Sequence, residues 1–386
     1  MCRNISIAIG FLFWLFGESS GQSQDRLVRR LLTIPVEVNN TAGMFLVDTG
    51  SDRTIIDLAF AQSLGLKSSG TVSVERNYST DEQTTTIAER VRIGPKKWSA
   101  VPLVMLDISM LSKIQMTPIS GILGTDLIET MTMRLSYSSG VAEVVDETDK
   151  KGFRVALDKV RNRYFVPVTI GTTTLEMLLD SGTNMTAMSA HGWELLPLSS
   201  RASRTSEGIK SSGSPAAALI ACIPSIQVGD AVLHEHPIRV ITPPSSGSFA
   251  DAAFAGILGG DILERFELTL DLKHSAMYLK YDDAFRADPY EFVTVGIQFF
   301  KSRADAFSVA AVWKGSPAEG AGIIVGDRII SVNGHASADL DEERFSKELH
   351  GAAGTPVTLD VERPSGKATL RMKTRQLVCE SGTGRL

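Results

Sequence analysis

The chain contains little cysteine. Its 386 residues include three cysteines, Cys2, Cys222 and Cys379. Cys2 lies in an N-terminal segment that we expect to be removed, and the two remaining cysteines are too few for a disulfide framework. A bridge between Cys222 and Cys379 stays open, but two unpaired thiols are the expected state. The cysteine content therefore does not predict a small, disulfide-held fold.

An excess of positive charge and long apolar runs are also missing. The net charge is −5, and no basic stripe with interleaved aromatic residues is found, so nucleic-acid binding is not expected. The longest apolar run near the N-terminus, Ile5–Phe16, spans 12 residues, which is short for a membrane span. With Arg3 before it and small residues at 19–21, residues 1–21 resemble a secretory signal peptide. We expect a secreted or periplasmic protein with no stable membrane span; an uncleaved membrane anchor is the alternative.

Metal-binding patterns are scarce. The sequence has no His-Glu-x-x-His segment. His234 and His236 have a strand spacing that suits a metal, but no third ligand of convincing spacing is near. They are therefore expected to be exposed loop histidines, and no metal or organic cofactor is predicted.

One short acidic pattern is present twice. Each copy is an Asp followed by a hydroxyl residue, a Gly and a second hydroxyl residue, and each follows an apolar run, Met44–Val47 or Met177–Leu179. An acid at the end of a buried strand is costly to desolvate, and the Gly permits a sharp turn and a close approach of the backbone. The neighbouring hydroxyls are expected to orient the carboxyls. The copies are Asp48, Thr49, Gly50 and Ser51, and Asp180, Ser181, Gly182 and Thr183.

These patterns belong to a longer internal repeat. A shift of 132 residues places Asp48 on Asp180, and a shift of 135 places Gly121–Asp126 on Gly256–Asp261. Asp126 and Asp261 each precede a Glu by three residues, the spacing of a capping box. We interpret both as structural caps of short helices, and not as catalytic acids. The first two-thirds of the chain therefore consists of two copies of one unit.

Two carboxyls held a few ångströms apart cannot both ionise easily, so they share a proton. The ionised member can take a proton from water while the other donates one to a carbonyl oxygen. A two-fold relation between the repeats would bring Asp48 and Asp180 together in this way. The alternative is that both acids cap turns in a non-catalytic scaffold.

Both repeats resemble retropepsin-type aspartic protease units, over about residues 30–284. The resemblance rests on the two Asp-Thr/Ser-Gly-Ser/Thr motifs and on the apolar-apolar-Gly that follows each. It implies an all-β, two-lobed pseudo-dimer in one chain, similar to the pepsin arrangement, with Asp48 and Asp180 catalytic at the lobe junction. A hairpin bracketing Asn77–Asp81 is expected to fold over a cleft, with Tyr78 as the candidate flap residue, but it lacks the glycine-rich tip of the viral enzymes. Its counterpart in the second repeat is Glu207–Gly213.

The C-terminal region resembles a PDZ domain over about 90 residues. The resemblance rests on Ser316–Ile323 and on Gly326–Gly334, which follow the pattern Ser-Pro-Ala-x-x-Ala-Gly-Ile…Gly-Asp-x-Ile-x-x-Val-Asn-Gly. It implies binding of an extended peptide as an added strand. The residues that match the carboxylate-binding loop are Thr294, Val295, Gly296 and Ile297.

The predicted fold is therefore mainly β, with two retropepsin-like lobes and a small α+β PDZ domain. The expected divisions are a signal peptide 1–21, lobes 22–150 and 151–285, a PDZ domain 286–378 and a tail 379–386. We expect a monomeric aspartic endopeptidase that acts on peptide or protein substrates and also binds a PDZ peptide ligand. A secreted peptide-binding adaptor without activity is the main alternative. A serine-type protease, a class to which PDZ modules are often attached, is disfavoured because no plausible Ser/His/Asp set is found.

Overall fold

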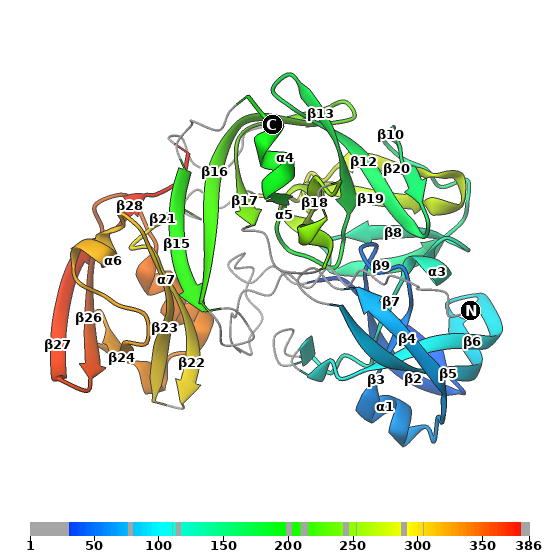
Figure 1. Cartoon of the computed structure of the whole chain (residues 1–386), viewed down its shortest axis with the longest axis horizontal. Helices are drawn as coiled ribbons and strands as arrows, with labels where there is room; N and C mark the ends of the chain where they lie inside the picture. Colours follow the sequence, from blue (N-terminus) through cyan, green and yellow to red (C-terminus); the bar gives the residue numbers. More distant parts are fainter. Residues whose placement is uncertain are drawn as a thin grey trace.

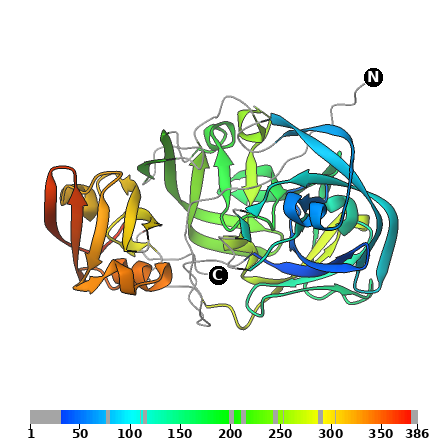
Figure 2. The same cartoon turned by 90° about the horizontal axis from the view of Figure 1, so that it is seen from below.

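The computed structural model describes residues 31–75, 80–109, 111–112, 117–197, 203–209, 215–241, 247–251, 253–286, 292–303 and 305–379. The expected signal peptide and residues 380–386 lie outside this part of the chain. Figures 1 and 2 show the first repeat and the C-terminal region at opposite ends of the molecule, with the second repeat between them. In the described residues, no helix is long and apolar enough to cross a membrane.

The first lobe is a seven-stranded sheet that closes on itself. Its strand order is β1-β2-β7-β3-β6-β5-β4, and β1 also pairs with β5. In β1, Ile34, Val36 and Val38 are buried while the residues between them are more exposed, as expected of a strand with one face in a core. The elements are β1 Thr33–Val38, β2 Thr41–Val47, β3 Ile55–Asp57, α1 Leu58–Ser63, β4 Ser68–Glu75, β5 Thr80–Ile93, β6 Lys96–Leu106, β7 Gly121–Leu123 and α3 Thr125–Ile128.

The second lobe repeats this order. Its strands run β11-β12-β13-β18-β14-β17-β16-β15, and β12 also pairs with β16. In both lobes a parallel pairing sets a Gly-Ile-Leu strand beside the strand that precedes the acid. The elements are β11 Asp158–Val160, β12 Arg163–Ile170, β13 Thr173–Leu179, β14 Ala187–Ser189, α4 Ala190–Glu194, β15 Ser203–Ile209, β16 Pro215–Val228, β17 Ala231–Ile241, η1 Ser248–Ala250, β18 Gly256–Leu258 and α5 Gly260–Leu263.

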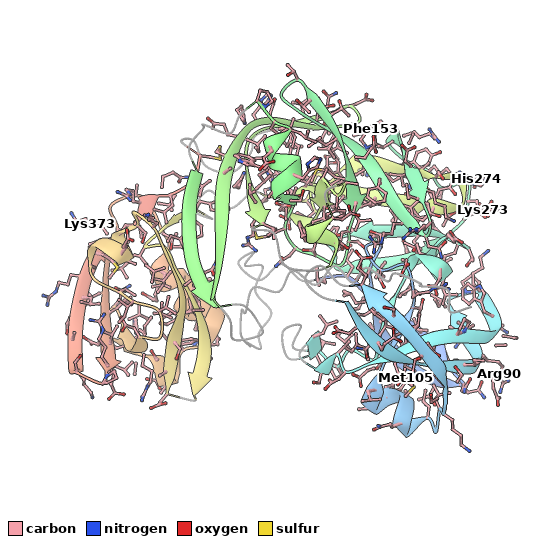
Figure 3. The ribbon with its side chains drawn as sticks, viewed as in Figure 1. Arg90, Met105, Phe153, Lys273, His274 and Lys373 are labelled. Atoms are coloured by element: carbon pink, nitrogen blue, oxygen red, sulfur yellow. A yellow bond between two sulfur atoms is a disulfide. The ribbon has the colours of Figure 1, made fainter. Side chains whose placement is uncertain are left out.

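A five-stranded sheet joins the two lobes. Its order is β10-β20-β19-β8-β9, so β8 from the first repeat pairs directly with β19 from the second. Phe153, labelled in Figure 3, lies at the start of β10. Its ring packs edge-on against Phe266 and also contacts Tyr281. Buried side chains of both lobes and of this sheet form one continuous core. The elements are β8 Thr132–Ser136, β9 Val141–Val145, β10 Phe153–Ala156, β19 Phe266–Asp271, η2 Leu272–His274 and β20 Ala276–Tyr281.

The C-terminal region has its own core around Phe299, Phe307 and Phe345. Ser316, which precedes Pro317, caps helix α6 by accepting a hydrogen bond from the Glu319 N–H. The elements are β21 Val293–Thr294, β22 Ile297–Arg303, β23 Ala306–Trp313, α6 Pro317–Gly320, β24 Arg328–Val332, β25 His335–Ala336, η3 Ser337–Asp339, α7 Glu342–Leu349, β26 Pro356–Arg363, β27 Gly366–Lys373 and β28 Arg375–Gln376. The mainly β, two-lobed fold with a small α+β domain is thus confirmed. The exact domain boundaries stay predictions.

Three features fasten the C-terminal region to the second lobe. Strand β15 pairs with β23, so one 14-stranded sheet runs through both regions (Figure 1). Ile220 of β16 packs in an apolar cluster with Phe292, Trp313 and residues 377–379. A disulfide joins Cys222 to Cys379. The expectation of two unpaired thiols was therefore wrong, because the fold brings together two cysteines that are 157 residues apart in the chain.

Candidate functional site

Asp48 and Asp180 each begin the loop that follows a central strand, β2 or β13. The Asp48 N–H donates a 3.0 Å hydrogen bond to the Leu123 carbonyl, and the Asp180 N–H donates a 3.1 Å bond to the Leu258 carbonyl. Leu123 and Leu258 end the Gly-Ile-Leu strands β7 and β18, which run parallel to β2 and β13. Each repeat therefore places its acid by the same local structure.

Reciprocal hydrogen bonds join the two acid loops. The Thr49 Oγ1 donates to the Leu179 carbonyl at 2.8 Å and accepts from the Ser181 N–H at 3.0 Å. The Ser181 Oγ donates to the Val47 carbonyl at 2.8 Å and accepts from the Thr49 N–H at 3.1 Å. All four bonds are buried, where a broken bond leaves an unsatisfied polar group. The relative position of the two acids is therefore fixed by bonds between the repeats.

The two glycines of the motifs let the acids approach. A Cβ built on Gly50 would lie 2.5 Å from the Cγ of Asp180, and a Cβ on Gly182 would lie 2.3 Å from the Cγ of Asp48. Both distances are shorter than any real contact, so a side chain at either position would push the opposite carboxyl away. Each carboxyl thus lies against the backbone of the other repeat's loop.

Both carboxyls are fully buried, and backbone N–H groups hold their inner oxygens. The Oδ1 of Asp48 accepts from the N–H groups of Gly50 at 2.8 Å and Ser51 at 3.2 Å. The Oδ1 of Asp180 accepts from the Gly182 N–H at 3.0 Å. Among the described residues, neither Oδ2 atom accepts a hydrogen bond from an N–H or hydroxyl group. The carboxyls of Asp48 and Asp180 instead interact with each other.

The electrostatics of the two acids differ. Burial raises the pKa of Asp48 to about 6, although the N–H groups of Gly50 and Ser51 oppose this shift. Burial also raises the pKa of Asp180 well above its usual value, and the neighbouring Asp48 charge raises it further. Because like charges this close cannot both form easily, the pair holds a proton into the neutral range. The proton belongs to the pair of carboxyls.

The hydroxyls that flank the acids act differently from the prediction. Thr49 and Ser181 bond across the repeats, and the Ser51 Oγ donates to the Arg53 carbonyl at 2.7 Å. The Thr183 Oγ1 is buried without a hydrogen-bond partner among the described residues. None of these hydrogen bonds reaches a carboxyl, because the loop turns the Thr49 and Ser181 side chains toward the opposite strand. The backbone orients the acids, while Thr49 and Ser181 align the repeats.

Asp126 and Asp261 do not cap their helices, and this part of the prediction was wrong. Helices α3 and α5 begin after Gly124 and Gly259, which offer no side-chain cap. The Asp126 Oδ1 instead accepts from the Thr54 Oγ1 at 2.7 Å, and the Asp261 Oδ1 accepts from the Thr186 Oγ1 at 2.6 Å. The two acids therefore brace the segment after each motif. Their role is structural, but it is not capping.

His236 is buried, in contrast to the expectation of two exposed loop histidines. His234 is exposed on β17, whereas His236 has 2% relative exposure and its Nε2 lies 3.1 Å from the Asp261 Oδ2. Glu235 between them has a φ of 52°, which turns the strand and places the two side chains in different surroundings. In the described residues, no group of three or more His, Cys, Asp or Glu side chains could hold a metal.

The other predicted site residues belong to the two hairpins and to the carboxylate-binding loop of the PDZ domain. Tyr78 and the turn at 76–79 lie outside the described residues, as do residues 210–214 of the second hairpin. The segment Thr294–Ile297 is buried. Within it, the Val295 N–H donates to the Leu349 carbonyl and the Gly296 N–H donates to the Thr294 Oγ1. The role of this segment in holding a peptide carboxylate stays a prediction.

Sequence reasoning missed a charged group beside the acid loop. Arg163, at the start of β12, is mostly buried and interacts with Asp52 and with Glu75 of β4. The sequence signal for Arg163 comes from a comparison of the two repeats, because the shift of 132 residues places Arg163 on Leu31. A charged residue in one repeat where the other has an apolar residue marks a departure from the two-fold relation.

Family comparisons agree with the division of the chain. Residues 34–127 and 166–262 match the family described as aspartyl protease. Residues 308–363 match the PDZ domain. The two protease segments coincide with the two lobes, and the third lies in the C-terminal region.

Individual relatives match over short stretches. A protein of Staphylococcus aureus (strain COL) named probable CtpA-like serine protease is 34% identical over 91 residues, covering 24% of this chain and 18% of the relative. The chloroplastic carboxyl-terminal-processing peptidase 3 of Arabidopsis thaliana is 38% identical over 56 residues, covering 14% and 11%. This chain therefore spans less than a fifth of these curated relatives. A solved photosystem II D1 C-terminal processing protease is 25% identical, covers 24% of this chain and 25% of its own, and has a TM-score of 0.22.

Proposed function

We propose that this chain, which belongs to the aspartyl protease family and carries a PDZ domain, is an aspartic endopeptidase. One observation supports this most: two fully buried carboxyls, Asp48 and Asp180, come from opposite repeats and are locked together by Thr49 and Ser181. Burying two acids side by side costs folding free energy, so such a pair is expected where chemistry requires it. The position of each carboxyl against the other repeat's loop supports a shared pair over two separate turn caps.

The proposed reaction divides the two roles by environment. Asp48, whose ionised form is favoured by two backbone N–H groups, acts as the base, and Asp180 holds the shared proton. Asp48 takes a proton from water as the water oxygen bonds to the carbonyl carbon, and Asp180 donates its proton to the carbonyl oxygen. In the resulting diol, a hydroxyl proton returns to Asp180, the Asp48 proton passes to the amine nitrogen, and the C–N bond breaks. Acid and base are both side chains of this chain, so the proposal needs no metal or organic cofactor.

The PDZ domain indicates binding of a peptide or protein. We propose that it captures or regulates the substrate, with the residues 294–297 as the candidate carboxylate loop. Some relatives are named serine proteases, but they share only a short stretch with this chain. The type of chemistry is therefore proposed from the carboxyl pair and not from those names.

We also propose a secreted or periplasmic location and a monomeric enzyme. The Cys222–Cys379 disulfide supports the location, because such bonds persist in oxidising compartments. Both acids lie in one chain, so no second copy is required to complete the site.

The test compares residues 22–386 of the wild type with Asp48→Asn and Asp180→Asn on a mixed quenched-peptide library from about pH 3 to 8. We expect each variant to lose at least about a hundredfold in turnover while remaining folded, since acid–base catalysis of this kind contributes about 10²–10⁴. A serine-directed sulfonyl fluoride should leave the wild type active. Retained activity in either variant would contradict the shared pair. Binding of C-terminal peptides without turnover by any protein would favour the adaptor.

A further inference from the structure

The loop that begins at Asp180 is fastened at both ends to the end of β18 and the start of α5. At its start, the Asp180 N–H donates to the Leu258 carbonyl at 3.1 Å. At its end, the Oδ1 of Asp261 accepts hydrogen bonds from the Thr186 N–H at 2.8 Å and from the Thr186 Oγ1 at 2.6 Å. The Thr186 Oγ1 also accepts from the Gly259 N–H at 3.0 Å. The Asp261 carboxylate therefore holds the far end of the acid loop.

His236 of β17 contacts the other oxygen of this carboxylate. Its Nε2 lies 3.1 Å from the Oδ2 of Asp261, and both side chains have 3% relative exposure. Because an ionised carboxylate only accepts hydrogen bonds, the Nε2 is the donor, and such charge-assisted bonds are strong. The Nδ1 of His236 is buried without a hydrogen-bond partner among the described residues. The carboxylate of Asp261 is therefore the polar partner that the described residues give this imidazole.

Strand β17, which carries His236, is itself bound to the acid loop. The Arg239 N–H of β17 donates to the Thr186 carbonyl at 3.3 Å. The Arg239 Nη2 donates to the Sδ of Met185 at 3.2 Å. Strand β17 also runs parallel to β14, which follows the loop. His236 is therefore held in a fixed relation to Thr186, and its contact with Asp261 completes a closed set of bonds around the end of the loop.

The first lobe has a valine at the position of His236. The shift of 135 residues places His236 on Val101 and Asp261 on Asp126. Asp126 holds its own loop through the Thr54 Oγ1, but Asp126 is partly exposed, whereas Asp261 is buried. A carboxylate that reaches solvent needs fewer protein donors than one that is buried. The histidine is thus found in the lobe where the bracing carboxylate is buried.

We propose that His236 is a positioning residue for Asp180. By donating to the Oδ2 of Asp261, His236 fixes the carboxylate whose Oδ1 holds Thr186, and the second acid loop is thereby kept in one position against the first. His236 acts through these residues and is not itself a catalytic residue. This inference rests on the proposed function, because the position of Asp180 affects a reaction rate only if the acid pair is catalytic.

Loss of this donor should reach the acid pair through Thr186. A valine at position 236 removes the Nε2–H from the buried Oδ2 of Asp261, and a buried acceptor that loses its donor is costly. The carboxylate then takes up a proton or turns toward another donor, and either change weakens the two bonds that its Oδ1 accepts from Thr186. A catalytic group displaced by about 1 Å can lose about a hundredfold in rate. A buried contact away from the acid pair should therefore affect turnover.

The deciding experiment is amide hydrogen exchange of the full chain with His236→Val, which gives the second lobe the residue found in the first. Exchange in peptides covering residues 180–190 should be about fivefold faster than in the wild type, the effect of losing one hydrogen bond. The internal control is the first acid loop, in peptides covering residues 48–58, where exchange should not change. Unchanged exchange at 180–190, or equal acceleration in both loops, would overturn the proposal.

Further variants separate this role from a general loss of packing. His236→Gln keeps a donor and should restore exchange close to that of the wild type. The matched control is His234→Gln, which changes an exposed histidine on the same strand and should leave exchange unchanged. Because His236 acts through Asp261, adding His236→Val to Asp261→Asn should speed exchange little beyond Asp261→Asn alone. Fully additive effects of the two substitutions would contradict the proposal.

Turnover of a peptide substrate gives the second readout. His236→Val should lower kcat by about tenfold or more and leave KM nearly unchanged, because the substitution alters the position of Asp180 and no group proposed to bind the substrate. His236→Gln should restore most of kcat. A higher KM with unchanged kcat, or full kcat in a folded His236→Val protein, would contradict the positioning role. If exchange responds as expected but the wild type cuts no peptide, the positioning of the loop stands and the proposed function fails.

Discussion

The corresponding hairpins of the two lobes have different neighbours. In the described part of the first lobe, β4 ends its sheet and pairs with β5 alone. In the second lobe, the equivalent strand β15 pairs with β16 on one side and with β23 of the PDZ domain on the other. The repeats have thus kept their two-fold relation at Thr49 and Ser181, where the acids are aligned, and lost it at the hairpins. Among the described residues, the first hairpin therefore keeps an edge strand without a second neighbour, whereas the edge of the second hairpin is covered.

The largest expected effect concerns the attachment of the second hairpin. Replacing Cys222 and Cys379 by serine should lower the free energy of unfolding by about 2–4 kcal/mol, because the disulfide closes a loop of 157 residues. Chemical denaturation with and without a reducing agent measures this loss. The reductant should destabilise the wild type and leave the serine variant unchanged. An equal response of both proteins would show that the bond does not hold the two regions together.

The two acids should differ from surface acids in their effect on stability. The pKa of Asp48 is raised in the folded state, so its stabilising contribution is complete below about pH 4 and is lost as the pH rises through about 6. Asp48→Asn should therefore gain stability relative to wild type between pH 4 and pH 8, by roughly 2–3 kcal/mol for a pKa raised to about 6. Denaturation at both pH values measures the gain, with the exposed Asp283→Asn as control. A gain that is the same at both pH values would contradict the assigned burial cost.

The hydrogen bonds between the acid loops offer a test of the two-fold relation. Thr49→Ala and Ser181→Ala should each cost about 1–3 kcal/mol, because each leaves a buried N–H and a buried carbonyl unsatisfied. Thr49→Ser and Ser181→Thr keep the hydroxyl and should cost much less. Thermal unfolding of the four variants gives the comparison. A large difference between the two alanine variants would show that the loops are not equivalent.

The smallest expected change in stability concerns a buried contact in the core of the second lobe. His236 contacts Asp261 in the second lobe, and the shift of 135 residues places it on Val101 in the first. His236→Val should cost about 1–2 kcal/mol, because the Asp261 Oδ2 loses a buried partner. His236→Gln, which can keep one hydrogen bond, is the control. A valine variant as stable as the wild type would mean that the second lobe does not need this pair.

Features repeated along the chain were open to prediction from the sequence. Three patterns occur in both repeats: the acid motif, the Gly-Ile-Leu-Gly segment and the strand alternation. The second copy of each pattern supports the interpretation of the first. Features that occur once and join distant residues could not be predicted from the sequence. The Cys222–Cys379 bond and the Arg163–Glu75 contact depend on how the regions pack, which no local pattern reports. His236 was misjudged for a local reason: the positive φ of Glu235 interrupts the alternation, and Ala100 has the same turn, with a φ of 53°, in the first repeat.

The sheet that runs from the second lobe into the PDZ domain has a practical consequence for dissecting the protein. Removing residues after about 286 would take away β23, leave the backbone edge of β15 unpaired, uncover Ile220 and leave Cys222 as a free thiol. An unpaired strand edge beside an apolar residue invites association with other chains. The two parts look like separable modules when the sequence is read from end to end, yet a shortened protease would differ from the intact one in solubility and redox behaviour as well as in ligand binding.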